Sequence, residues 1–456
     1  MLRIERIKNP NLTTDNEAFR YGHPLYSRGL VDTLLQSNEN TMFNFTGKEV
    51  YKNIGKDILN KAEQQNISIG KLFGVGGIDM LSLDSLPEEY NDVWFETNIT
   101  NFIRLPKRFC RHILKRFKFI IVDYVEGGRF VGNNLINPIE ELSKITTDFR
   151  QVVVATSGYH KSVKQGHNWS TLSIPMYLIY CYSYMHDVAK ERVYSPNKLA
   201  MLLVNKPRYV RLLVLSKLHM NNLLEDSTWS CNINFDFDKM TLYRNPITKE
   251  ELEQYNLLPY NEIWAGKVID HDHPDYNIIE KFKRDNSHLF PKSIHGLDFV
   301  KDQVIETAFN LVPDLIGKHH FHIAVETDME SILPAQYNKD NVFTNGFVSD
   351  KTFKSFFYCN PTLLLGDQGS IEYCKKLGFV FPEKSLDLNL DNLHDSIDCI
   401  VDILSSPINA EENKFCAETN YNKVLDKDFL CNLVLDEINK LKEAAPTPSV
   451  GNTATF

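Results

Sequence analysis

The fold of this chain is decided by residues 319–379, which read HHFHIAVETDMESILPAQYNKDNVFTNGFVSDKTFKSFFYCNPTLLLGDQGSIEYCKKLGF. The apolar run FHIAV is followed by the carboxylate of Glu326, and FVSDKTFK (347–354) has the pattern of a helix start. A second apolar run, PTLLLGD (361–367), leads through a Gly-Ser turn into another helical pattern. This strand-helix-strand-helix order predicts an α/β fold with a parallel sheet, in which ligands bind at the carboxyl ends of the strands.

The composition is that of a large globular protein. Its 456 residues favour two or three domains, and 43% hydrophobic with 24% charged residues is enough to build a large core. Because the formal net charge is -9, any contact with nucleic acid requires a local basic patch. The 8 cysteines contain no CxxC pair, which argues against a zinc ribbon and favours a reducing, cytoplasmic compartment. The longest apolar run, IPMYLIYCYSYM, is too short and too polar to span a bilayer, and no secretory signal is visible at the N-terminus.

Further apolar runs divide the chain into two predicted domains. In the first half, strands are expected at ISIGKLFG (67–74), FKFIIVD (117–123), RQVVVATS (150–157) and MYLIYCYSY (176–184). They predict a Rossmann-like domain over 1–195, with ERVYSPNK (191–198) as a linker. A strand through Val204 and a helix from about Pro207 open a second domain over 196–442. A loop-rich insertion at 236–298 and a disordered tail at 443–456 complete the prediction.

Basic side chains follow the predicted strands of the second domain. VNKPRYVR (204–211) places Arg208 and Arg211 in the first helical turn after a strand, where their planar guanidinium groups suit phosphate oxygens. Lys351 and Lys354 lie one helical turn apart at the start of the later helix, and Asp350 beside them could accept hydrogen bonds from ribose hydroxyls. The alternative is that these are surface charges. Ser349 or Asp350 would then be only a helix cap, and Glu326 a surface carboxylate.

Two carboxylates and a basic segment stand out in the first half. Asp123 and Glu126 in FIIVDYVEGG follow an apolar strand, so either could serve as a base or could only cap a turn. The segment RLPKRFCRHILKRFK (104–118) contains seven Lys or Arg and no acid. It predicts a basic amphipathic helix that is a solvated face, a DNA contact or a contact with an anionic membrane. The residues along its basic face are Arg104, Arg108, Arg111 and Lys115.

Two histidine groups, HDHPD (271–275) and HHFH (319–322), invite a metal interpretation. Alternate residues of a strand share one face, so two of these side chains could point the same way. No further ligand has the spacing that zinc sites show, and we therefore predict no metal site.

The order of these motifs resembles fucosyltransferases of the GT-B type, and more closely a group of phage and large-virus glycosyltransferase-like proteins. FHIAVET, FVSDKTFK and PTLLLGDQGSIEY follow the order of the family's strand-carboxylate, Thr-Glu-Lys-Thr-x-Lys-Pro and Gly-Ser-Leu-x-Tyr elements. NKPRYVR and DYVEGG match its Asn-x-Pro-Arg-x-x-Arg and Asp-x-x-Glu-Gly elements. The chain departs from the pattern at Ser349, Asp350 and Ser355, where the family has Thr, Glu and Pro.

The resemblance implies a metal-independent enzyme with two Rossmann-like domains facing a central cleft. Its co-substrate would be a UDP- or GDP-linked sugar, with no cofactor required. Glu126, ahead of Asp123, would be the catalytic base. The implied donor-binding residues are Arg208, Arg211, Glu326, Ser349, Asp350, Lys351, Thr352 and Lys354.

Three functions are compatible with the resemblance. We rank first the transfer of a sugar to a hydroxymethylated pyrimidine in double-stranded phage DNA, with the basic segment contacting the duplex. The second is transfer to a glycan or a lipid-linked sugar. The third is a nucleotide-binding protein without catalysis, because the shorter acid at Asp350 could mark a degenerate site.

Overall fold

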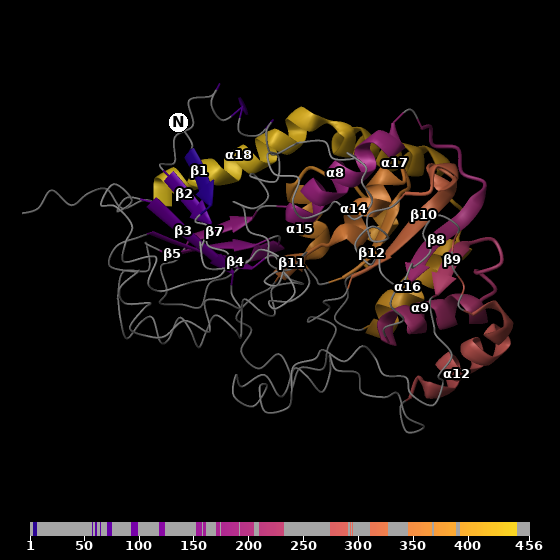
Figure 1. Cartoon of the computed structure of the whole chain (residues 1–456). Coiled ribbons are helices and arrows are strands. Elements are labelled where there is room, and N and C mark those ends of the chain that lie inside the picture. Colours follow the sequence, from indigo (N-terminus) through magenta and orange to yellow (C-terminus); the bar gives the residue numbers. More distant parts are fainter. Residues whose placement is uncertain are drawn as a thin grey trace, which may run out of the picture. The chain divides into compact units, whose positions relative to one another are not determined.

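The chain divides into two compact units, Met1–Met176 with Lys427–Phe456 and Tyr177–Asp426 (Figure 1). The predicted linker lies inside the second unit, where the Ser195 amide donates to the Gly317 carbonyl at 2.8 Å. The computed structural model describes residues 3–6, 71–74, 93–98, 118–123, 152–156, 158–160, 170–173, 175–190, 192–204, 209–231, 274–290, 311–326, 345–366, 369–388 and 393–444, with positions 57, 60, 61, 64, 292 and 294.

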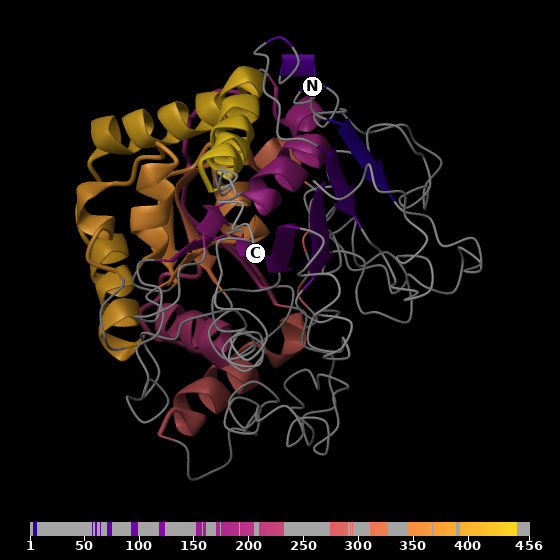
Figure 2. The same cartoon turned by 90° about the vertical axis from the view of Figure 1, so that its left-hand side faces the viewer.

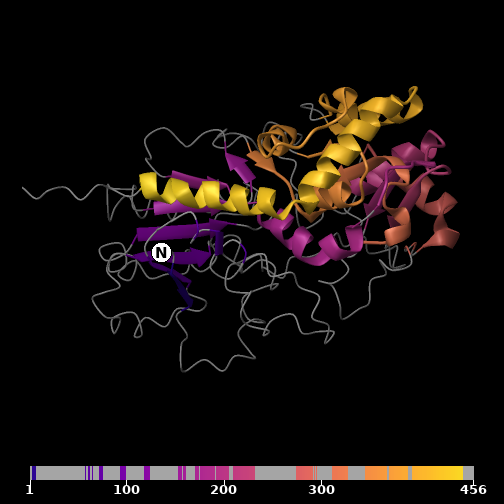
Figure 3. The same ribbon diagram turned by 90° about the horizontal axis from the view of Figure 1, so that it is seen from above.

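The first unit contains a six-stranded sheet in the order β1-β2-β3-β4-β5-β7, and each neighbouring pair is parallel. Its strands are β1 (Arg3–Arg6), β2 (Lys71–Gly74), β3 (Val93–Asn98), β4 (Lys118–Asp123), β5 (Val152–Thr156) and β7 (Ser170–Ser173), and the short β6 (Gly158–His160) follows β5. The C-terminal helix α18 (Lys427–Ala444) packs against β7 (Figure 3). The Ser173 amide donates to the Glu437 carboxylate at 2.9 Å, which ties the helix to the end of that strand.

The second unit is built on a parallel four-stranded sheet, as expected for an α/β fold. Its order is β12-β10-β8-β9, formed by β8 (Lys198–Val204), β9 (Thr228–Cys231), β10 (His319–Val325) and β12 (Thr362–Leu365). After β8 the chain adds β9 on one side and then returns to add β10 on the other side. The order therefore reverses between β8 and β10, and this is the position at which open α/β sheets bind ligands.

The helices of the second unit cover both faces of this sheet (Figure 2). Phe321, Ile323 and Val325 of β10 belong to a core shared with α9, α12 and α16, whereas His322 points to the other face and packs against Tyr358 at the end of α14. The elements are α8 (Met176–Ala189), α9 (Tyr209–Met220), α12 (Tyr276–Asp285), α14 (Asp350–Phe357), α15 (Ser370–Lys376), α16 (Leu393–Ser405) and α17 (Ala410–Leu425), the strand β11 (Asn345–Phe347), and 3-10 turns at Ser287–Leu289, Pro313–Leu315 and Glu383–Ser385. None of the helices in the described ranges is long and apolar enough to cross a membrane.

The expected strand at residues 176–184 is wrong, because this stretch forms the larger, N-terminal part of helix α8. Tyr and Ile favour strands, and this preference suggested the strand. The buried positions Leu178, Tyr182, Met185 and Ala189 recur at intervals of three or four residues, which is the period of a helix. Packing on several sides of α8 therefore outweighs the β propensity of its residues.

The predicted loop-rich insertion at 236–298 also contains regular structure. Helix α12 lies within it and packs on α9 (Figure 2). Ile279 and Phe282, three residues apart, are buried, and Phe282 packs edge-on against Phe290 with ring centroids 5.7 Å apart. This short apolar stripe is easily overlooked among the surrounding charges of YNIIEKFKRD.

His322 is a buried titratable group in the middle of β10. Burial, with smaller contributions from His319 and Lys354, lowers the pKa of His322 from 6.5 to about 3. Its imidazole is therefore neutral in the folded protein at neutral pH. Burial also lowers the pKa of the neighbouring His319 from 6.5 to about 4.

We predict that His322 makes the fold sensitive to acid. Below pH 6.5 the unfolded chain binds a proton at this residue, whereas the folded chain does not until about pH 3. The free energy of unfolding should fall in this window by up to about 1.4 kcal/mol per pH unit. His322→Leu removes this contribution. Urea unfolding at several pH values should therefore show that the free energy of unfolding falls less steeply with decreasing pH in the variant than in wild type. His288→Leu, at an exposed histidine, is the control and should leave the pH dependence of wild type unchanged. The same pH dependence of the free energy of unfolding in wild type and His322→Leu would contradict the prediction.

Candidate functional site

The candidate site lies where β10 ends, beside the point at which the strand order reverses. Val325 is the last residue of β10, and the Glu326 amide still donates to the Leu365 carbonyl of β12 at 2.9 Å. This bond holds the backbone of Glu326 in register with the sheet. The Glu326 side chain is fully buried, so its carboxylate depends on hydrogen-bond donors from the protein.

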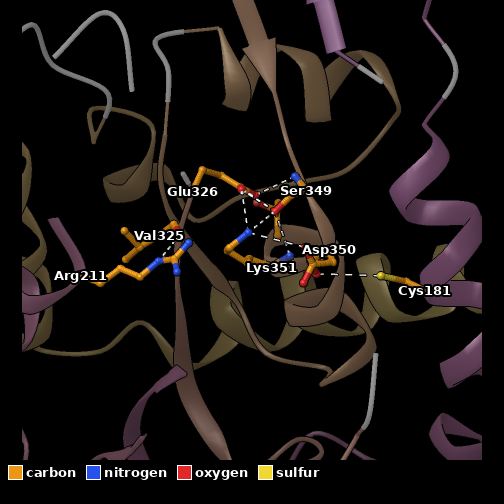
Figure 4. A network of polar contacts seen from close by, with 8 residues as sticks. Cys181, Arg211, Val325, Glu326, Ser349, Asp350 and Lys351 are labelled. Carbon is orange, nitrogen blue, oxygen red and sulfur yellow. Dashed lines mark hydrogen bonds and ion pairs between the residues drawn. The ribbon is translucent and has the colours of Figure 1, made fainter. Parts of the chain in front are cut away.

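Those donors come from the start of α14 (Figure 4). Glu326 Oε1 accepts from the Ser349 amide at 2.8 Å and from Thr352 Oγ1 at 2.5 Å. Glu326 Oε2 accepts from Ser349 Oγ at 2.6 Å. Three short hydrogen bonds therefore stabilise the buried charge and fix the first turn of α14 against the end of β10.

Ser349 is the N-cap of α14 and also holds the side chain that follows it. Its Oγ accepts from the Lys351 amide at 3.3 Å, as an N-cap hydroxyl does, and from Lys351 Nζ at 2.9 Å. Lys351 Nζ lies 3.6 Å from Asp350 Oδ1 and 3.9 Å from Glu326 Oε2. With 28% of its side chain exposed, Lys351 presents a cation to solvent at the start of the helix.

A second cation reaches the same place from α9. Arg211 lies in the first turn of α9, and its Nε donates to the Val325 carbonyl at 3.4 Å (Figure 4). The side chain is buried, so the bond orients the guanidinium at the end of β10. The helices α9 and α14 thus each supply one cation at the end of β10, Arg211 against Val325 and Lys351 near Glu326.

Lys354, on the next turn of α14, and Cys181, on α8, are both buried. Burial lowers the pKa of Lys354 to about 8, although Asp350 and Cys181 act in the opposite direction. Burial, followed by the charge of Asp350, raises the pKa of the Cys181 thiol well above its usual range. Cys181 is therefore a protonated, weakly nucleophilic side chain whose Sγ lies 3.9 Å from the Asp350 carbonyl.

The structure brings together six of the predicted donor-binding residues at the end of β10 and places a seventh, Lys354, on the next turn of α14. Lys354, predicted beside Lys351 as a phosphate ligand, is only 8% exposed. Cys181, which was not among the predicted site residues, approaches from α8. The helical period of residues 176–189 is the sequence signal that could have placed it on a buried helix face. The residues gathered at the end of β10 are Arg211, Glu326, Ser349, Asp350, Lys351 and Thr352.

The side chains of the other predicted site residues lie outside the described part of the chain. Asp123 is the last residue of β4, but its side chain is not described. In the described ranges no group of three His, Cys, Asp or Glu is arranged to hold a metal ion. The predicted positions that fall outside are Arg104, Arg108, Arg111, Lys115, Glu126 and Arg208. His271 and His273, for which no metal site is predicted, also fall outside.

No family model, curated protein or solved structure matches the chain. The chemistry of the site is therefore inferred from its own groups. It combines a partly exposed lysine, a buried arginine, a carboxylate already bonded within the protein, and the positive end of a helix dipole. Such a set suits a ligand that carries phosphate groups.

We predict that Thr352→Val lowers the free energy of unfolding by about 1–3 kcal/mol, because the buried carboxylate loses its 2.5 Å donor. Valine has nearly the shape of threonine, so the change removes the hydroxyl with little effect on packing. Thr352→Ser keeps the donor and is the control for the lost methyl group. Urea unfolding at pH 7 measures both variants. If Thr352→Val were as stable as wild type, the hydrogen bond to Glu326 would make no net contribution to the free energy of unfolding.

Proposed function

We propose that this protein is a nucleotide-sugar-dependent glycosyltransferase that binds the diphosphate of its donor at the end of β10. One observation carries the proposal: Arg211 from α9 bonds to Val325 and Lys351 from α14 lies near Glu326, the next residue, where the strand order of the sheet reverses. Arginine and lysine side chains at that edge are suited to bind a nucleoside diphosphate. The order of the sequence motifs, which resembles that of glycosyltransferases, supports sugar transfer as the reaction.

In the proposed reaction an acceptor hydroxyl attacks the anomeric carbon of the sugar, and the bond from that carbon to the diphosphate oxygen breaks. Negative charge grows on the departing diphosphate in the transition state. We propose that Lys351, with Arg211, stabilises this charge. Asp350, whose side chain is 20% exposed beside Lys351, is the proposed acceptor for the ribose hydroxyls.

The acceptor hydroxyl must also lose a proton. We propose Glu126, with Asp123 as the alternative, as the base in the first half of the chain. A GT-B arrangement, with one Rossmann-like domain for the donor and one for the acceptor, belongs to the same proposal. It is supported by the parallel sheets of the two units, each considered by itself.

The acceptor we propose is a hydroxymethylated pyrimidine in double-stranded DNA. The supporting feature is the basic segment 104–118, with seven cations in a chain whose net charge is -9. A base inside a duplex must leave the stack before its hydroxymethyl group can reach a transferase site. A glycan or lipid-linked acceptor is the other outcome that the acceptor experiment below distinguishes.

We predict that Lys351→Met weakens the binding of UDP or GDP by about tenfold or more, because the diphosphate loses a cation. Isothermal calorimetry with both nucleotides measures the affinity. Lys376→Met is the matched control: Lys376 lies on α15, exposed and 3.5 Å from Glu372, and should leave the affinity unchanged. An unchanged affinity in Lys351→Met would remove the diphosphate from this site.

Transfer itself is tested with a panel of UDP- and GDP-linked sugars against hydroxymethylated duplex DNA, unmodified duplex DNA and free glycans. Mass spectrometry of the nucleosides and glycans reads the product. We expect a mass increase of one sugar on the hydroxymethylated base alone. A product on the glycans only would reject the DNA acceptor. Diphosphate binding with neither transfer nor donor hydrolysis would show a nucleotide-binding protein and reject the enzyme.

A further inference from the structure

We propose that Glu326 is a positioning residue that acts through Ser349 on Lys351, and not a ligand of the donor. This inference rests on the proposed function, since Lys351 is the cation to which it assigns the diphosphate. The resemblance implied that Glu326 would contact the sugar or the nucleotide. The geometry points to a different role, in which a buried anion sets the position of an exposed cation.

The first argument is that Glu326 has no room for a ligand. Its side chain is completely buried, and the Ser349 amide, the Ser349 hydroxyl and the Thr352 hydroxyl all donate to its two oxygens. Its stem is enclosed as well: a Cβ added at Gly366 would lie 3.5 Å from Glu326 Cβ and 3.1 Å from Ser370 Oγ. A ribose or sugar hydroxyl would have to displace one of these contacts to reach the carboxylate.

The second argument concerns the direction of the Ser349 proton. A carboxylate can only accept, so the 2.6 Å contact requires the Ser349 hydroxyl to donate to Glu326 Oε2. The lone pairs of Ser349 Oγ are then left to accept from Lys351, whose Nζ lies at 2.9 Å and whose amide lies at 3.3 Å. The charge of Glu326 thereby makes Ser349 an acceptor for the lysine.

The third argument is that the cation is held on one side only. Among the described residues, Ser349 Oγ is the one acceptor within 3.5 Å of Lys351 Nζ, while Asp350 and Glu326 oxygens lie at 3.6 and 3.9 Å. An ammonium has three N–H donors, so Lys351 keeps donors for a further ligand. Because 28% of the side chain is exposed, a phosphate group can approach them from solvent.

Glu326→Gln separates charge from shape. The carboxamide oxygen can still accept from the Ser349 amide and from Thr352, but its NH₂ group faces Ser349 Oγ. Ser349 Oγ must then accept from this group as well, so its two lone pairs no longer serve both the amide and the Nζ of Lys351. The contact that holds the lysine is weakened although the packing is kept.

A double-mutant cycle tests this mechanism through GDP and UDP binding. We expect Glu326→Gln to weaken binding by about tenfold in the native background and by less than about twofold in the Lys351→Met background. A residue that binds the donor directly, or that only supports the fold, would cause the same loss in both backgrounds. Equal losses would therefore overturn the proposal.

Ser355→Ala is the matched control for destabilisation of α14. Ser355 Oγ donates to the Thr352 carbonyl at 2.6 Å and contacts Thr362 Oγ1 at 2.5 Å, and these hydrogen bonds do not involve Glu326 or Lys351. We expect a lower thermal midpoint and an unchanged affinity. If Ser355→Ala weakened GDP and UDP binding as much as Glu326→Gln, loss of stability alone would explain the effect, and the positioning role would be rejected.

A second measurement needs no nucleotide. Acylation of lysines by an N-hydroxysuccinimide ester, mapped by peptide mass spectrometry, reports how freely Lys351 moves, with Lys376 as the internal reference. We expect Glu326→Gln to raise the rate at Lys351 about threefold relative to Lys376. If wild type binds neither GDP nor UDP, the proposed function fails, and this ratio still tests the link to Lys351. An unchanged ratio would overturn the link whatever the nucleotide result.

Discussion

The buried carboxylate of Glu326 is the interaction on which the candidate site depends. A charge with no exposure to water must be met by donors from the protein, and here Ser349 and Thr352 supply them. These donors are spaced so that both point to one side of the first turn of α14. The need of the buried carboxylate for donors therefore fixes where α14 begins and how its first turn faces β10. Glu326 and Ser349 are nevertheless 23 positions apart in the sequence.

The topology of the sheet adds the second cation. Because β9 and β10 lie on opposite sides of β8, the segment that follows β8 and the residue that ends β10 meet at the same edge. Arg211 and Val325 are 114 positions apart in the chain and are joined by a hydrogen bond. The site is thus made by convergence of distant segments, and no single motif contains it.

The two lysines of α14 show how position alone separates similar residues. Lys351 lies at the helix start with an exposed side chain, whereas Lys354, three residues on, is buried beside Asp350 and Cys181 with a pKa lowered to about 8 by burial. The same helix thereby carries one cation that a ligand can reach and one that is enclosed in the protein. His322 lies on the face of β10 that packs against the end of α14, where its imidazole is buried and neutral.

The sequence alone determined the elements around the site, because periodicity and end signals are local. The apolar runs gave β10 and β12, and Ser349 before DKTFK marked the start of α14. Tertiary structure decided the rest. It made residues 176–189 the helix α8 and placed α12 against α9. It also buried Lys354 and gave the Glu326 carboxylate hydrogen-bond donors from α14. Exposure and hydrogen-bond partners depend on residues far away in the chain, so no local pattern could specify them.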